Sequence, residues 1–127
     1  MATHWTLGGD AEDPQRIGAF WALALGYVKE PGFDEPDVAS IIDPDGRGPA
    51  ICFLKVPEGK TAKNRMHIDI RVAGPAPWDL TERARLIRAK VPELVAAGAT
   101  MIREEWYGDD LGHVVMEDPE GNEFCVA

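Results

Sequence analysis

The chain lacks the features that mark several common classes of protein. It has no uninterrupted apolar run near the roughly 18 residues that cross a membrane, so no membrane-embedded protein is expected. Its first residues, MATHWTLGGD, lack the basic and apolar regions of a secretory signal, which predicts a cytoplasmic protein. There are only two cysteines, Cys52 and Cys125, and without a secretory signal both thiols are expected to stay reduced.

Basic side chains are also scarce. The sequence has 13 Lys and Arg residues against 22 Asp and Glu residues, which gives a formal net charge of −9 at pH 7. A nucleic acid would meet repulsion from this charge, so we expect no nucleic-acid partner. The 127 residues are enough for one domain, 1–127, that buries a core without disulfide bonds or a structural metal.

Turn and cap signals divide the first half of the chain into short elements. A strand is predicted at residues 3–7, where Gly8-Gly9 would end it. A helix is predicted to begin at Asp13-Pro14, an N-cap followed by a proline in the first turn, and to end at Gly26. Three short strands are then expected, at residues 27–29, 38–42 and 50–56.

The second half repeats this order. The clearest alternation of apolar and polar residues, at 65–72, predicts a strand whose polar face carries His67, Asp69 and Arg71. A helix is predicted from about Asp79 to Gly98, with a kink at Pro92. Three strands follow, at residues 100–106, 112–117 and 122–127. Large apolar residues of both halves form the predicted helix-to-sheet core: Phe20, Leu23, Ile68, Ile70, Leu86, Leu94, Phe124 and Val126.

The last two strands are predicted to form a hairpin. The turn DPEGN, residues 118–122, combines a proline that presets φ with a glycine that tolerates positive φ. If Glu117 pairs with Glu123, then Val115 lies opposite Cys125, and His113 lies diagonally from Cys125 on the same face.

These pieces together resemble a known family. The twofold strand-helix-strands order, Asp13-Pro14 before Phe20-Trp21, NRMHIDI at 64–70 and DPEGNEFC at 118–125 are similar to the glyoxalase-like branch of the vicinal oxygen chelate superfamily. That superfamily includes bleomycin-resistance proteins and dioxygenases. The resemblance implies an α+β fold of paired βαβββ modules, about 1–60 and 61–127. It also implies a curved mixed sheet around a concave cavity, helices on the convex face, and a homodimer.

The resemblance also suggests where a metal would bind. Metal-dependent members take one ligand each from the first, fourth, fifth and eighth strands, usually His or Gln, Glu, His and Glu. The fifth-strand position falls on His67, the eighth on Cys125, the fourth near Phe53 and the first near Thr6, with His4 two residues earlier. His67, Cys125 and His4 could hold zinc or nickel. Because both carboxylates are missing, we expect no complete metal site and no resident cofactor.

Two interpretations of the polar residues stay open. Cys125 can be core filler, or His113 and His67 can lower the pKa of its thiol and make it a catalytic nucleophile. His67 can belong to a structural polar cluster or to a catalytic site. The expected ligand pocket is the concave face, with Trp106 on a loop as a cover over the ligand. Its predicted lining is His4, Phe53, His67, Asp69, Arg71, His113 and Cys125.

Three functions are compatible with this pattern. The protein can be an enzyme for a small polar or carbonyl metabolite, with His67 as acid or base and Arg71 neutralising an anionic group. It can also bind or sequester a small molecule, as resistance proteins do. The third alternative is a metal-dependent lyase or dioxygenase. The fold alone does not decide between them.

Overall fold

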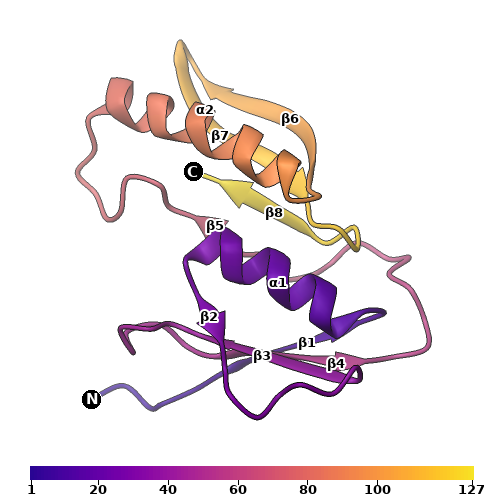
Figure 1. Ribbon diagram of the computed structural model, residues 1–127. Helices are drawn as coiled ribbons and strands as arrows, with labels where there is room; N and C mark the ends of the chain where they lie inside the picture. The colour runs from indigo at the N-terminus through magenta and orange to yellow at the C-terminus, as the bar shows by residue number, and fades with distance from the viewer. The chain divides into compact units, whose positions relative to one another are not determined.

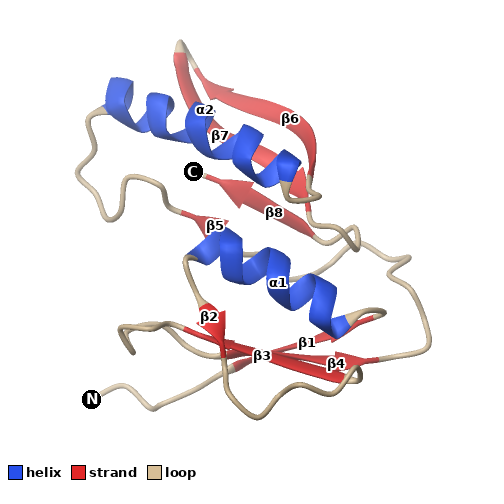
Figure 2. Ribbon diagram, viewed as in Figure 1, coloured by secondary structure: helices blue, strands red, loops and turns tan.

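The structure is a computed structural model that describes residues 1–127, and it divides the chain into two compact units, Met1–Gly59 and Lys60–Ala127. Each unit contains one helix and one mixed four-stranded sheet, an α+β fold with the predicted twofold order of elements (Figures 1 and 2). Neither helix has the length and apolar character needed to span a membrane.

The first unit is built from four strands and one helix. These are β1 (Leu7–Ala11), α1 (Pro14–Leu25), β2 (Val28–Lys29), β3 (Val38–Ile42) and β4 (Ile51–Lys55). The sheet order is β1-β4-β3-β2, with β1 parallel to β4 and the other pairs antiparallel. The helix packs on β3 and β4.

The first strand begins later than predicted. It starts at Leu7 and contains Gly8 and Gly9, which were expected to end a strand at residues 3–7. The glycines have a packing role, because a Cβ on Gly9 would lie 3.1 Å from Cδ1 of Phe53 on the neighbouring strand. A glycine inside this strand thus marks a position where a side chain of the neighbouring strand lies close to the backbone, and not a turn.

The predicted ends of α1 are confirmed. The Asp13 carboxylate accepts a hydrogen bond of 3.2 Å from the backbone N–H of Arg16, and Pro14 occupies the first turn. Gly26 caps the C-terminus with a φ of 71°, a left-handed conformation that favours glycine.

The second unit repeats the arrangement. It contains β5 (Asp69–Ile70), α2 (Leu80–Ala96), β6 (Thr100–Tyr107), β7 (Asp110–Glu117) and β8 (Glu123–Val126). The sheet order is β5-β8-β7-β6, and β5 runs parallel to β8. The regular part of β5 is shorter than the predicted 65–72. Backbone hydrogen bonds from Cys125 to the Ile68 carbonyl and from Val72 to the Ala127 carbonyl extend the pairing on both sides.

The core of each unit lies between its helix and one face of its sheet. Phe20, Ile70, Leu94, Phe124 and Val126 are buried as predicted. Leu23 is 47% exposed, so its predicted core position is wrong. The buried stripe of α1 includes Ile17, Phe20, Trp21 and Ala24, and Leu23 lies off that stripe. Ile68 and Leu86 are only half-buried.

The hairpin turn after β7 fixes the register that the sequence predicted. Oδ1 of the buried Asp118 accepts hydrogen bonds of 2.9 Å from the backbone N–H groups of Glu120 and Asn122. Gly121 has a φ of 85°. Across the hairpin, Glu117 pairs with Glu123 and Val115 pairs with Cys125. This register places Cys125 on the same sheet face as Asp69, its partner on β5.

Candidate ligand site on the second unit

An open pocket with a volume of about 420 Å³ lies on the second unit. Side chains of β5 and its flanks, β7 and β8 line it together with residues of α2 and the end of β6. Five residues predicted from the sequence meet there: His67, Asp69, Arg71, His113 and Cys125. Arg83 and Gly112 also line the pocket, and the sequence had not indicated them. Tyr107 lines it as well, and it follows Trp106, the aromatic residue that was predicted to cover the ligand.

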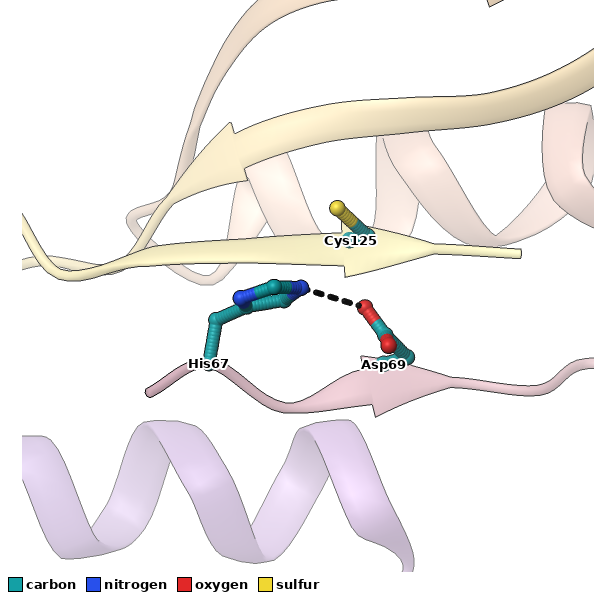
Figure 3. A group of neighbouring side chains, drawn as sticks. All are labelled: His67, Asp69 and Cys125. Carbon is teal, nitrogen blue, oxygen red and sulfur yellow. Dashed lines mark ion pairs between the residues drawn. The ribbon is translucent and has the colours of Figure 1, made fainter. Parts of the chain in front are cut away.

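His67, Asp69 and Cys125 form a compact group of polar side chains. Figure 3 shows His67 and Asp69 reaching from the β5 segment toward β8, which carries Cys125. Nε2 of His67 lies 3.2 Å from Oδ1 of Asp69, and the two side chains are 51% and 53% exposed. One donor atom from each of the three residues lies within 4.8 Å of the others.

The Cys125 thiol is held in its protonated form. Burial is the largest cause, followed by the Asp69 charge and a hydrogen bond to Asp69, and together they raise the pKa of Cys125 to about 11. The Arg103 guanidinium opposes this shift. The predicted lowering of this pKa by His113 and His67 is therefore wrong, because a neighbouring carboxylate and desolvation disfavour the thiolate.

A tyrosine and a histidine form a second polar pair in the pocket. The Tyr107 hydroxyl lies 2.8 Å from Nδ1 of His113. The Tyr107 ring passes over Gly112, where a Cβ would lie only 2.6 Å from Cε2 of the ring. A glycine in the middle of β7 is the sequence signal that could have revealed this close approach.

Arg83 is the buried cation of the pocket. It is only 8% exposed, and its Nη1 and Nη2 donate to the backbone carbonyls of Leu111, at 3.0 Å, and Gly112, at 2.5 Å. Its Nε is buried without a hydrogen-bond partner. The signal in the sequence was an arginine one turn before Ile87 on the buried stripe of α2.

Arg71 and Arg83 share an aromatic neighbour. The guanidinium carbon of each lies 5.1 Å from the centroid of the Trp78 ring, a cation–π distance. Neither guanidinium makes an ion pair with a carboxylate. The one acidic residue that lines the pocket, Asp69, pairs with His67 instead.

Three residues predicted for the site lie elsewhere. His4 is exposed and precedes β1, so its expected place on the first strand is wrong. Phe53 is 8% exposed and faces α1, where a Cβ on Gly18 would lie 3.8 Å from its ring. Trp106 belongs to β6 and not to a loop, and its indole Nε1 donates to the Glu104 carboxylate at 3.0 Å.

The donor set of the group matches the family's metal chemistry only in part. Asp69 replaces His4 beside His67 and Cys125, so all three donors come from the second unit. Imidazole, carboxylate and thiol suit zinc or nickel better than the hard cations manganese and magnesium, which prefer oxygen. A thiol whose pKa is raised to about 11 must lose its proton before it can bind a metal, which weakens the site.

Comparisons with known proteins identify the family to which this fold belongs. The profile of a family described as glyoxalase-like domain matches residues 6–127. No curated protein matches the chain at a significant level.

Several solved structures share the fold. A glyoxalase/bleomycin resistance protein/dioxygenase family enzyme from Burkholderia phytofirmans is 19% identical with a TM-score of 0.67, over 95% of this chain and 94% of that chain. The fosfomycin resistance protein FosX from Listeria monocytogenes, complexed with Mn(II) and 1S,2S-dihydroxypropylphosphonic acid, is 12% identical with a TM-score of 0.68, over 99% and 90%. Oxidase ChaP-H2 is 16% identical with a TM-score of 0.62, over 99% and 92%. Similarity at these identities establishes the fold alone.

Proposed function

The chain belongs to the glyoxalase-like domain family of the vicinal oxygen chelate superfamily, and we propose that it binds a small carbonyl metabolite and moves a proton on it. The site of this activity is the pocket of the second unit. The observation that carries the proposal is the His67–Asp69 pair, 3.2 Å apart, at that pocket.

His67 has the arrangement of a general base. Oδ1 of Asp69 lies 3.2 Å from Nε2 of His67. A carboxylate at this distance favours a proton on Nε2, which leaves Nδ1 free to act as the base. A carboxylate that orients an imidazole in this way is a recurring device for proton transfer. Nδ1 can then take a proton from a carbon next to the substrate's carbonyl group.

The other side chains of the pocket support the same chemistry. Tyr107 and His113, joined by their 2.8 Å contact, offer hydrogen-bond donors to a carbonyl oxygen on which negative charge develops. Cys125 holds its proton, so we assign it a packing and hydrogen-bonding role and no nucleophilic role.

Two alternatives each have one supporting observation. Binding or sequestration without turnover is favoured by the exposure of His67 and Asp69, 51% and 53%, which leaves the pair in contact with water. Metal-dependent lyase or dioxygenase chemistry is favoured by the three donor atoms within 4.8 Å of one another. Zinc is the ion that His67, Asp69 and Cys125 would suit best.

Deuterium exchange tests the proposed proton transfer. A panel of small carbonyl metabolites is first screened by thermal shift, since a ligand of the folded state raises its stability. Each hit is then incubated with the protein in D₂O, and exchange at the carbon next to the carbonyl is followed by NMR. His67→Gln should slow this exchange about a hundredfold or more, the usual contribution of a general base.

His4→Gln is the matched control, because His4 is an exposed histidine outside the pocket. Exchange should proceed in this variant at the rate of the unaltered protein. A hit that binds but does not exchange supports sequestration, and exchange that survives His67→Gln refutes the assigned base. Exchange that requires added zinc supports the metal-dependent alternative.

The proposal includes a homodimer, which the family resemblance implies, and a cytoplasmic location. Sedimentation at micromolar concentration tests the dimer, and a monomer at that concentration would overturn it. Fractionation of the source cells tests the location.

A further inference from the structure

We infer that the ligand of the second-unit pocket carries an oxyanion, a carboxylate or a phosphate group, which Arg71 and Arg83 recognise. This inference rests on the proposed function only in that both concern the same pocket. It adds the charge of the ligand and assigns two residues to its recognition.

Arg83 is a buried charge without a counterion. More than nine tenths of the residue is buried, and its two Nη atoms are held by the carbonyls of Leu111 and Gly112. Neutral carbonyl groups fix the orientation of the guanidinium but leave its charge uncompensated. Nε is buried without any partner. Burying such a charge is costly, so its retention at a pocket points to a role that an anion completes.

Arg71 supplies the second positive charge, and it can contact the ligand directly. It is exposed, lines the same pocket and makes no ion pair. Its contact with Trp78, at 5.1 Å from the ring centroid, limits the positions of its guanidinium. A guanidinium held against an aromatic ring is well suited to bind the two oxygens of a carboxylate or phosphate.

The pocket differs in charge from the rest of the chain. The protein carries a formal net charge of −9, yet its pocket contains two arginines, two histidines and one carboxylate. That carboxylate, Asp69, is already paired with His67. A negative ligand group would therefore meet two guanidinium charges that no side chain of the pocket neutralises.

The combination of cations with the His67–Asp69 pair defines a substrate class. A molecule with an oxyanion at one end and a carbonyl group next to it would place the first at Arg71 and the second near His67. Short 2-oxo acids have this chemistry. A phosphate-bearing carbonyl compound has it as well, so the test must separate the two oxyanions.

Matched probes test the inference on the full chain. We would measure the dissociation constants of 2-oxobutyrate and its neutral amide, 2-oxobutyramide, by NMR titration of backbone amide resonances in the pocket. Because a charge-assisted hydrogen bond is lost in the amide, 2-oxobutyrate should bind about tenfold tighter or more. Inorganic phosphate is then added as a competitor. Displacement of 2-oxobutyrate identifies a general oxyanion site, and no displacement identifies a carboxylate site.

Two arginine variants locate the site. Arg71→Gln should abolish the preference for the acid over the amide, and this exposed position should tolerate the change. Arg88→Gln is the matched control, since Arg88 lies 5.7 Å from the Trp106 ring centroid, outside the pocket. It should leave the preference unchanged. Arg83→Lys keeps a charge but lacks the planar guanidinium whose two Nη atoms contact the two carbonyls, and it should weaken acid binding more than amide binding.

The outcomes separate this inference from the proposed function. If the amide binds as tightly as the acid, or if the preference survives Arg71→Gln, the oxyanion assignment is overturned while the carbonyl pocket stands. If the acid binds without exchanging its protons, the oxyanion site stands and the proton transfer fails. If neither probe shifts resonances of the pocket, the inference of a short 2-oxo acid ligand is overturned, and the proton transfer is judged on the metabolite panel alone.

Discussion

Asp69 and Cys125 are paired across the parallel ladder of β5 and β8, and the carboxylate of one faces the thiol of the other. Burial and this carboxylate raise the pKa of the thiol to about 11. At neutral pH Cys125 is therefore a protonated thiol that donates toward Asp69, and Asp69 serves both Cys125 and His67. The same pairing that brings three potential metal donors together also keeps one of them protonated.

Replacing Asp69 should lower the raised pKa of the Cys125 thiol in part. In Asp69→Asn the negative charge is gone, so the pKa of Cys125 should fall from about 11 toward its ordinary value of 9.0. Burial remains, so the fall should be partial. The pH dependence of iodoacetamide alkylation measures it, in a Cys52→Ser background that leaves Cys125 as the only thiol. Glu117→Gln, which also removes a carboxylate from this sheet, is the control and should leave the profile unchanged.

The sequence predicted the elements of this site better than its chemistry. Period-two alternation placed His67, Asp69 and Arg71 on one strand face, and the turn at 118–122 fixed the register that brings Cys125 beside them. Both signals are local in the chain. The direction of the Cys125 pKa shift depends on burial and on a neighbour from another strand, which no local pattern records.

Other parts of the structure could not be predicted for similar reasons. A Gly-Gly pair is compatible with a turn or with a crowded strand, and only Phe53 across the sheet decides for the strand. From the sequence, no prediction was made for Arg83. Its pocket role depends on the carbonyls of Leu111 and Gly112, which lie 28 and 29 positions further along the chain.

The raised pKa of Cys125 should make the fold less stable in alkaline solution. The folded state holds this proton more tightly than the unfolded state, whose thiol titrates near 9.0. The stabilisation is thus complete below pH 9.0 and is lost as the pH rises from 9.0 toward about 11. Urea unfolding at several pH values in this window tests it. Because other groups titrate there too, the informative quantity is the difference from Cys125→Ser, whose stability should fall less steeply.

Protein isolated without chelators or a metal-binding tag should carry no stoichiometric transition metal. The reason is the donor set: His67 and Asp69 are exposed, and the third donor is a protonated thiol. Elemental analysis of the purified chain measures this directly. A full equivalent of zinc or nickel that disappears in His67→Ala would contradict it and would favour the metal-dependent alternative.

The turn that sets the site's register should depend on Asp118. In Asp118→Ala the backbone N–H groups of Glu120 and Asn122 lose their acceptor at a buried position. The free energy of unfolding should fall by about 1–3 kcal/mol, the usual cost of such losses. Denaturant titration measures the change. Asp109→Ala alters an exposed aspartate in the neighbouring hairpin turn, and a loss there as large as in Asp118→Ala would argue against the assigned hydrogen bonds.

Gly112 should be required for ligand binding more than for folding. In Gly112→Ala the new Cβ would lie 2.6 Å from Cε2 of Tyr107, so the ring must move and lose its contact with His113. Tyr107 is 64% exposed and can swing into solvent, so the melting temperature should change little. Ligand affinity should fall about three- to tenfold, as for one lost hydrogen bond, and Tyr107→Phe should reproduce that loss. Gly8→Ala, which meets nothing within 4 Å, should bind normally. Unchanged affinity in both Gly112→Ala and Tyr107→Phe would remove the Tyr107–His113 pair from the site.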